Sequence, residues 1–158
     1  MTTVLNRDSI KVKRDLQKRV ENWVAEYCDA LEENFKQYTI RSYKTNINNP
    51  TEVSKGYTSY YEEQLQKIED GTYNLYKFDY KVGKKFIKVF NLQYSEACDY
   101  YNRPAGYRAG SVTAFIDKNT GEVYKPASWK APAKHVRFDL RIITERNYLS
   151  LIHISEPT

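Results

Sequence analysis

The spacing of hydrophobic residues changes at Gly71. Before this glycine, apolar residues recur every three or four positions, which is the spacing of one face of an α-helix. After it, apolar and polar residues alternate, which is typical of half-buried β-strands. Helices followed by a run of strands predict an α+β fold. The chain has 158 residues, and we expect residues 1–148 to form one α+β domain.

Two helices are predicted before Gly71. The first covers about 30 residues and begins at Asp8 or Ser9, either of which can supply an N-cap oxygen. Its apolar stripe consists of Ile10, Leu16, Val20, Trp23, Val24, Tyr27, Leu31, Phe35 and Tyr38. Because the stripe is rich in aromatic residues, we expect it to pack on a sheet, and a coiled-coil seam is the alternative. The second helix is weaker, covers residues 51–70 and ends at Gly71.

Four strands are predicted after Gly71, at residues 73–82, 86–95, 111–117 and 122–129. Short turns between them predict an antiparallel meander, with the two helices packed on one face. Gly121 has the position of a left-handed residue that closes a hairpin. Pro126 cannot donate a ladder hydrogen bond, so the fourth strand should be an edge strand or end there. Residues 96–110 are expected to form an insertion-like loop.

The sequence does not favour an enzyme. Outside the last ten residues there is one histidine, His135, and it has no neighbouring carboxylate or thiol in sequence. The chain has no clustered His, Cys, Asp or Glu residues of metal-ligand spacing and no glycine-rich phosphate loop. We therefore expect no catalytic residue, no metal and no cofactor.

The cysteines and the hydropathy of the chain indicate its redox state and whether it crosses a membrane or is secreted. Cys28 and Cys98 are far apart and form no CxxC motif, so we expect reduced thiols, although one disulfide stays open as an alternative. No stretch of about 20 apolar residues predicts a membrane span. No secretory signal is recognised at the first residues.

Cations and aromatic rings are interleaved near the end of the chain. The candidate binding residues are Lys125, Ser128, Trp129, Lys130, Lys134, His135, Arg137 and Arg141. Lysine and arginine neutralise phosphates while aromatic rings stack on bases, so this block predicts binding of nucleic acid or of a nucleotide-like anion. The net charge of +5 permits such a partner. The alternative is that Trp129 and Phe138 fill the sheet core while the lysines are merely solvated.

The expected loop at 96–110 is a second candidate surface. It carries Tyr100, Tyr101, Arg103, Tyr107 and Arg108. Tyrosine and arginine are the residues most enriched at the energetic centres of protein interfaces. The loop therefore predicts a protein-interaction surface, and a variable insertion without function is the alternative.

The segment SVTAFIDKNTGEVYKPASWKAPAKHVRF, residues 111–138, carries a family resemblance. It resembles the C-terminal signature SVxAFxDxxTGxVYKPASWKAPAK of a family of small proteins from tailed bacteriophages. That family has no established activity, so the resemblance implies a phage origin without a mechanism. It also implies a location in the host bacterial cytoplasm or in the virion.

These observations lead to two functional hypotheses. The first is a non-enzymatic phage accessory protein that binds nucleic acid or a nucleotide-like anion. The alternative is a protein-interaction module, either an inhibitor of a host factor or a minor virion component. The oligomeric state stays open.

The last ten residues, LSLIHISEPT at 149–158, are of a different kind. They resemble the translation of a transposase mosaic end and adapter used in sequencing-library preparation. We therefore expect a non-native tail that comes from shotgun sequencing of a metagenomic sample. No functional residue is assigned to this tail.

Overall fold

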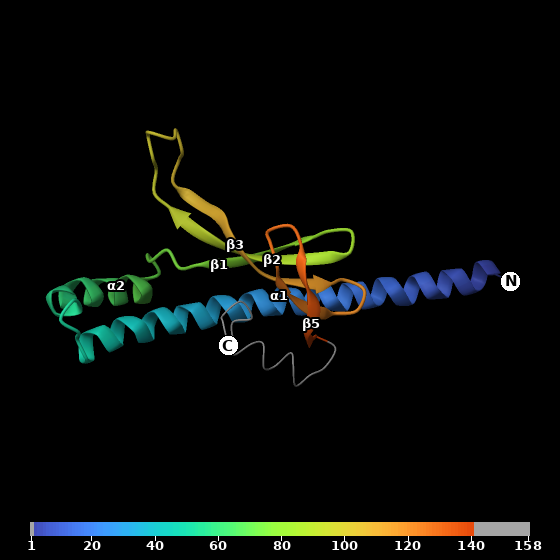
Figure 1. Cartoon of the computed structure of the whole chain (residues 1–158), viewed down its shortest axis with the longest axis horizontal. Helices are drawn as coiled ribbons and strands as arrows, with labels where there is room; N and C mark the ends of the chain where they lie inside the picture. Colours follow the sequence, from blue (N-terminus) through green and yellow to red (C-terminus); the bar gives the residue numbers. More distant parts are fainter. Residues whose placement is uncertain (1, 141–158) are drawn as a thin grey trace.

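The computed structural model describes residues 2–140, of which the side chains are described from residue 9 onward. Its elements are α1 (Thr2–Asn48), η1, a 3₁₀ turn (Ser54–Tyr57), α2 (Thr58–Asp70), β1 (Lys77–Val82), β2 (Phe86–Ser95), β3 (Gly106–Asp117), β4 (Glu122–Pro126) and β5 (Pro132–Asp139). Figure 1 shows α1 running along the length of the molecule, with the sheet lying across its middle. The predicted α+β class is confirmed. Arg141 and the tail at 149–158 lie outside the described residues.

The predicted first helix is too short. α1 spans 47 residues, about 70 Å at 1.5 Å per residue. It begins at Thr2, so neither Asp8 nor Ser9 is its N-cap. Its C-terminal part continues beyond the predicted end at Tyr38, because Tyr43 packs its ring 5.8 Å from that of Tyr61 on α2.

The second helix differs from the prediction in its start and in its packing. Thr51 and Ser54 exchange hydrogen bonds that hold this segment in turns, so that α2 begins only at Thr58. It ends as predicted, because Gly71 adopts a left-handed φ of 78° and caps the last turn. Figure 1 shows α2 beside the C-terminal end of α1, away from the sheet. The expectation that both helices pack on the sheet is therefore met by α1 alone.

The sheet has five antiparallel strands in the order β1-β2-β3-β4-β5. The meander is confirmed, but the predicted number of four strands is wrong. The missed strand is β5, in which polar residues and Pro132 obscure the alternation. It pairs with β4, with Phe138 opposite Val123. β4 ends at Pro126 as predicted, yet it is an inner strand.

Residues 96–110 are a loop only in part: residues 96–105 form the turn at the tip of a protruding hairpin, here called the arm, and residues 106–110 belong to β3. β3 begins at Gly106, opposite Ser95 of β2, and the hairpin continues to a bridge between Cys98 and Arg103. Figure 1 shows this hairpin bending away from the rest of the molecule. The glycines and the proline of this segment favoured a loop, but cross-strand packing of tyrosines keeps it extended, with the rings of Tyr94 and Tyr107 5.6 Å apart.

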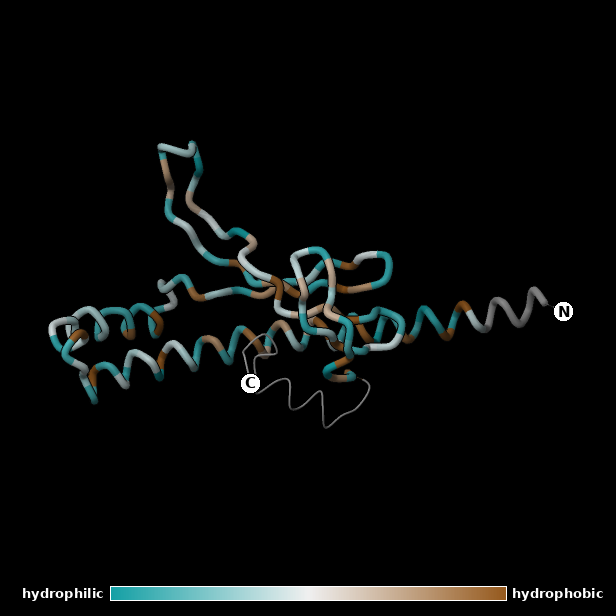
Figure 2. Tube along the Cα trace, in the orientation of Figure 1, coloured by the Kyte–Doolittle hydropathy of each residue, from teal (hydrophilic) through white to brown (hydrophobic). Residues whose placement is uncertain are grey.

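The core lies between α1 and one face of the sheet, here called the inner face. Figure 2 shows hydrophobic residues recurring along α1. The buried core residues of α1 are Val20, Val24, Tyr27, Cys28 and Leu31. Those of the sheet are Phe78, Ile87, Val89, Ala114, Ile116 and Val123, and Leu140 adds to them. The central part of the predicted stripe is thus confirmed. Its ends are not, since Ile10 and Tyr38 are exposed.

The two cysteines are both free. Burial raises the pKa of the Cys28 thiol to about 12, and the carboxylate of Asp79 adds to the effect. In residues 2–140, no helix is long and apolar enough to cross a membrane. Among the side chains described, from residue 9 to residue 140, no cluster of three His, Cys, Asp or Glu could hold a metal ion.

Candidate nucleic-acid interface

The face of the sheet opposite α1, here called the outer face, carries the alternate residues of each strand. In β2, Ile87 and Val89 are buried in the core on the inner face, so Phe86 and Lys88 lie on the outer face. Strand pairing places Lys88 between Lys81 of β1 and Phe115 of β3. The register therefore brings cations and aromatic rings into one row.

A shallow hollow of about 310 Å³ opens on this face. It is lined by Lys81, Gly83, Lys84, Lys85, Phe86, Lys88, Phe115 and Lys130. The lysines thus come from the β1–β2 hairpin and from the turn between β4 and β5. No carboxylate stands among these described lining residues. The hollow is therefore both cationic and aromatic.

The charges of these lysines are not neutralised within the described part of the chain. None of the five lies within 4.0 Å of a carboxylate oxygen. The nearby Asp117 is engaged elsewhere, because its carboxylate accepts the N–H groups of Asn119 and Thr120 in the β3–β4 turn, at 2.8 and 3.2 Å. Lys81 and Lys88 lie directly opposite each other, an arrangement that destabilises a sheet. A bound anion would remove this repulsion.

Trp129 stands beside the hollow. Its ring centroid is 6.1 Å from that of Phe90, and the Lys88 Nζ lies 4.5 Å from its centroid. Trp129 remains 43% exposed. Phe86 packs edge-on against Phe115, with centroids 6.2 Å apart. The hollow is thus bordered by a half-exposed indole that can stack on bases, while Phe86 and the buried Phe115 form its aromatic floor.

The turn between β4 and β5 places Trp129 and Lys130. The Ser128 hydroxyl oxygen accepts the backbone N–H groups of Lys130 and Ala131, at 3.2 and 3.1 Å. The Ala131 carbonyl oxygen accepts the N–H of Ala127 at 3.0 Å. Ser128 therefore caps the turn, which is the role that short hydroxyl side chains often take in turns.

The structure brings only some of the predicted binding residues to the hollow. Trp129 and Lys130 join the hollow and its border, whereas the exposed Lys125, Lys134 and His135 do not line it. Arg137 is half-buried, with its guanidinium carbon 5.8 Å from the centroid of the Phe138 ring. Phe138 packs against the core, as the alternative interpretation expected.

Sequence reasoning missed four of the five lysines in the hollow. They belong to the run KVGKKFIK at residues 81–88, which the prediction treated as two strand ends and a tight turn. The signal was the density of this run, four lysines in eight residues around a predicted hairpin turn. Figure 2 shows the turn of this hairpin as strongly hydrophilic.

A protein-family model described as a family of unknown function (DUF7717) matches residues 7–152. The chain belongs to this family. No curated protein and no solved structure matches the chain significantly. The DUF7717 match includes all five strands, so the hollow and the arm lie within the region that defines the family.

The residues predicted to form a protein-interaction surface lie at different places on the arm. Tyr100 and Tyr101 lie at its tip, 87% and 71% exposed, with their rings nearly perpendicular and their centroids 4.8 Å apart. Tyr107 instead ties the base of the arm to the segment before β1, because its hydroxyl donates to the Leu75 carbonyl oxygen at 3.0 Å. The Lys77 Nζ lies 4.4 Å from the centroid of the Tyr107 ring.

The two arginines of the arm lie close to its backbone. The Arg108 Nη2 donates to the Pro104 carbonyl oxygen at 2.9 Å, while the backbone of Arg103 forms the bridge to Cys98. Both side chains are half-buried. Of the five predicted residues, the two tip tyrosines therefore offer the largest exposed surface to a partner.

Proposed function

We propose that the outer face of the sheet binds single-stranded nucleic acid, and that the protein acts as a non-enzymatic accessory protein of a bacteriophage. The observation that carries the proposal is the hollow itself, in which five lysines with no carboxylate partner among the described residues surround two aromatic rings. The phage origin rests on the resemblance of residues 111–138. It implies a location in the host cytoplasm or in the virion.

A single strand fits this surface better than a duplex. Aromatic side chains stack on bases only where the bases are unpaired and their faces accessible. Trp129 offers an exposed ring, and the ammonium of Lys88 lies over it. Lysine side chains recognise phosphate as point charges and carry no code for base edges. We therefore expect little sequence preference.

Replacing Trp129 by alanine tests the proposal. We expect the wild-type protein to bind a labelled single strand of about 15 nucleotides more tightly than a duplex of the same length. Because stacking of one base contributes about 1–3 kcal/mol, Trp129→Ala should weaken binding by ~5- to ~150-fold. Fluorescence polarisation at low salt measures both effects. The matched control is Tyr57→Ala, which removes an exposed ring far from the hollow and should leave the affinity unchanged. Equal binding by the Trp129 variant, or no binding by the wild type, would refute the proposal.

The exposed tip of the arm favours a second candidate function, that of a protein-interaction module. Tyr100 and Tyr101 present two large rings that a partner pocket could bury. In a pull-down from a bacterial host lysate, the wild-type protein should retain a defined host protein that a Tyr100→Ser, Tyr101→Ser variant loses. Retention of the same protein by both forms would argue against the tip as the interface.

A further inference from the structure

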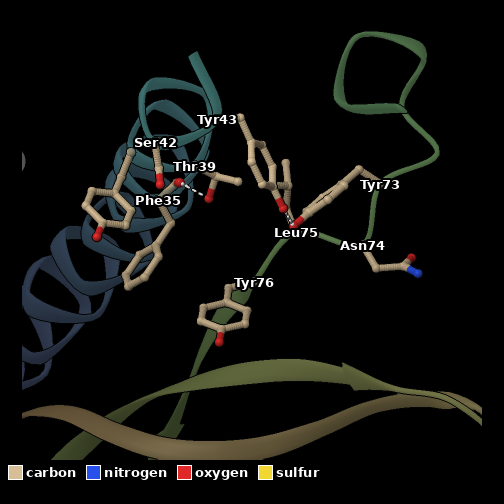
Figure 3. Close-up of a pocket in the computed structure, with 9 residues that line it drawn as sticks. Phe35, Thr39, Ser42, Tyr43, Tyr73, Asn74, Leu75 and Tyr76 are labelled. Carbon is tan, nitrogen blue, oxygen red and sulfur yellow. Dashed lines mark hydrogen bonds between the residues drawn. The ribbon is translucent and has the colours of Figure 1, made fainter. Parts of the chain in front are cut away.

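A second cavity lies between α1 and the segment that leads to β1, away from the hollow. Its volume is about 290 Å³. Phe35, Tyr38 and Tyr43 line it from α1, and Tyr73 and Tyr76 line it from the segment. Figure 3 shows that the labelled side chains come from two separate parts of the chain. No charged side chain is among the described residues that line it.

Four of the five aromatic rings that line the described part of this cavity are held by contacts with one another. Figure 3 shows Tyr43 reaching from the helix to Tyr73, and their hydroxyl oxygens are 2.7 Å apart. Tyr76 packs against Phe35, with centroids 5.5 Å apart. Tyr38 and Tyr76 nevertheless remain 63% and 40% exposed. Rings in mutual contact therefore form much of the cavity, and the exposed rings of Tyr38 and Tyr76 offer free surface for stacking.

The polar groups of the cavity are neutral. In the pair of tyrosine hydroxyls one donates to the other, so the proton of the accepting hydroxyl can still be donated to a ligand. Burial, followed by the hydrogen bond to Tyr73, raises the pKa of Tyr43. The hydroxyl therefore stays protonated at physiological pH. The Asn74 amide also lines the cavity and offers both a donor and an acceptor.

Size, charge and aromatic lining together restrict the ligand. A volume of about 290 Å³ is at the lower end for small-molecule sites and suits a single ring system. The described lining offers a charged ligand no counter-ion in direct contact, which favours an uncharged one. Rings at the sides favour a flat ligand, while hydroxyl and amide groups favour one with donors and acceptors at its edge.

We infer that this cavity binds one uncharged planar ring with hydrogen-bonding groups on its edge, which is the chemistry of a nucleobase, free or in a nucleoside. The site is independent of the proposed function. It shares no lining residue with the lysine hollow, and an uncharged ligand gains nothing from the lysines.

Titration of the full chain with adenosine, guanosine, cytidine and uridine, followed by saturation-transfer NMR, tests the inference. We expect at least one nucleoside to bind saturably, with a Kd of ~0.1 mM. Ribose alone should not bind. Because the ligand is uncharged, the affinity should not fall as salt rises, unlike that of an oligonucleotide on the outer face.

Variants locate the site. Tyr38→Ala should weaken nucleoside binding by ~5-fold or more, since it removes one stacking surface. The variant should fold, because Tyr38 is exposed on α1 and alanine favours helix. Tyr43→Phe should also weaken binding by removing a hydroxyl while keeping the ring. The matched control is Tyr57→Ala, which should bind as the wild type does, while Trp129→Ala distinguishes the cavity from the outer face.

Three results would overturn the inference: no saturable binding of any nucleoside up to ~10 mM, wild-type affinity in Tyr38→Ala, or loss of binding in Trp129→Ala. The last result would place the nucleoside on the outer face. Failure of oligonucleotides to bind leaves this inference intact, since none of its readouts depends on phosphate.

Discussion

Replacing Lys85, Lys88 and Lys130 together by glutamine is expected to weaken binding of a single-stranded oligonucleotide by ~10- to ~100-fold at low salt. Each exposed ion pair with a phosphate contributes up to about 1 kcal/mol, and about 1.4 kcal/mol corresponds to a tenfold change in affinity. The variant should also lower the salt dependence. Each lost phosphate contact reduces the slope of log K against log salt by about 0.7, which gives a change of about 2 for three lysines.

The control for this prediction removes the same charge at another place. Lys11, Lys13 and Lys18 are exposed on the N-terminal part of α1. Their replacement by glutamine should reduce affinity only slightly, through the lower net charge. If both triple variants lose affinity equally, binding follows net charge and not the hollow, and the proposed interface is wrong. Polarisation titrations at several salt concentrations provide all of these values.

The second large effect is expected in the core. Leu31→Ala should lower the free energy of unfolding by about 2–5 kcal/mol, because it removes a buried side chain and leaves a cavity. Leu31 is fully buried in the core between α1 and the inner face of the sheet. For a chain of this length, the thermal midpoint should fall by ~5–15 °C. Denaturant titration and thermal unfolding followed by circular dichroism measure the change.

Val12→Ala is the matched control for Leu31→Ala. Val12 is 68% exposed on the same helix, and alanine has the higher helix propensity. This variant should change the free energy of unfolding by less than about 0.5 kcal/mol. A loss of less than about 1 kcal/mol in Leu31→Ala would mean that α1 does not pack on the sheet as described.

The helical core and the general order of the fold could be predicted from sequence because their signals are local. Val20, Val24 and Leu31 repeat at helical spacing, and all three are buried. Gly71 ends α2 because a left-handed residue is needed there. The ends of α1 could not be found in this way. Its C-terminal part has few apolar residues in a polar sequence and is stabilised by packing against α2.

The arm and β5 were missed because pairing partners decide their conformation. Gly106 and Pro104 indicate a turn, yet the β2–β3 ladder extends to the pair Ser95–Gly106, and an isolated bridge joins Cys98 and Arg103 beyond it. In β5, polar residues are tolerated because the strand is at the edge of the sheet and pairs with β4 on one side. Local composition carries little information about such long-range pairing.

The candidate interface was predicted in part. Trp129 and Lys130 were recognised from the interleaving of cations and rings. The lysines of the β1–β2 hairpin were not, because they are about 45 residues away in sequence and join Lys130 only through the order of the strands. Their role follows from register, since Lys81 and Lys88 become neighbours only when β1 pairs with β2.

The central claim is that nucleic acid binds beside Trp129, and its fluorescence tests this most directly. The chain has two tryptophans, so a Trp23→Phe variant leaves Trp129 as the sole reporter. We expect a single-stranded oligonucleotide to quench its emission saturably, with a slope of log K against log salt of about −3 if four or five lysines each neutralise a phosphate. Unchanged emission at oligonucleotide concentrations that saturate binding by polarisation would contradict the account, because the strand would then bind elsewhere on the protein.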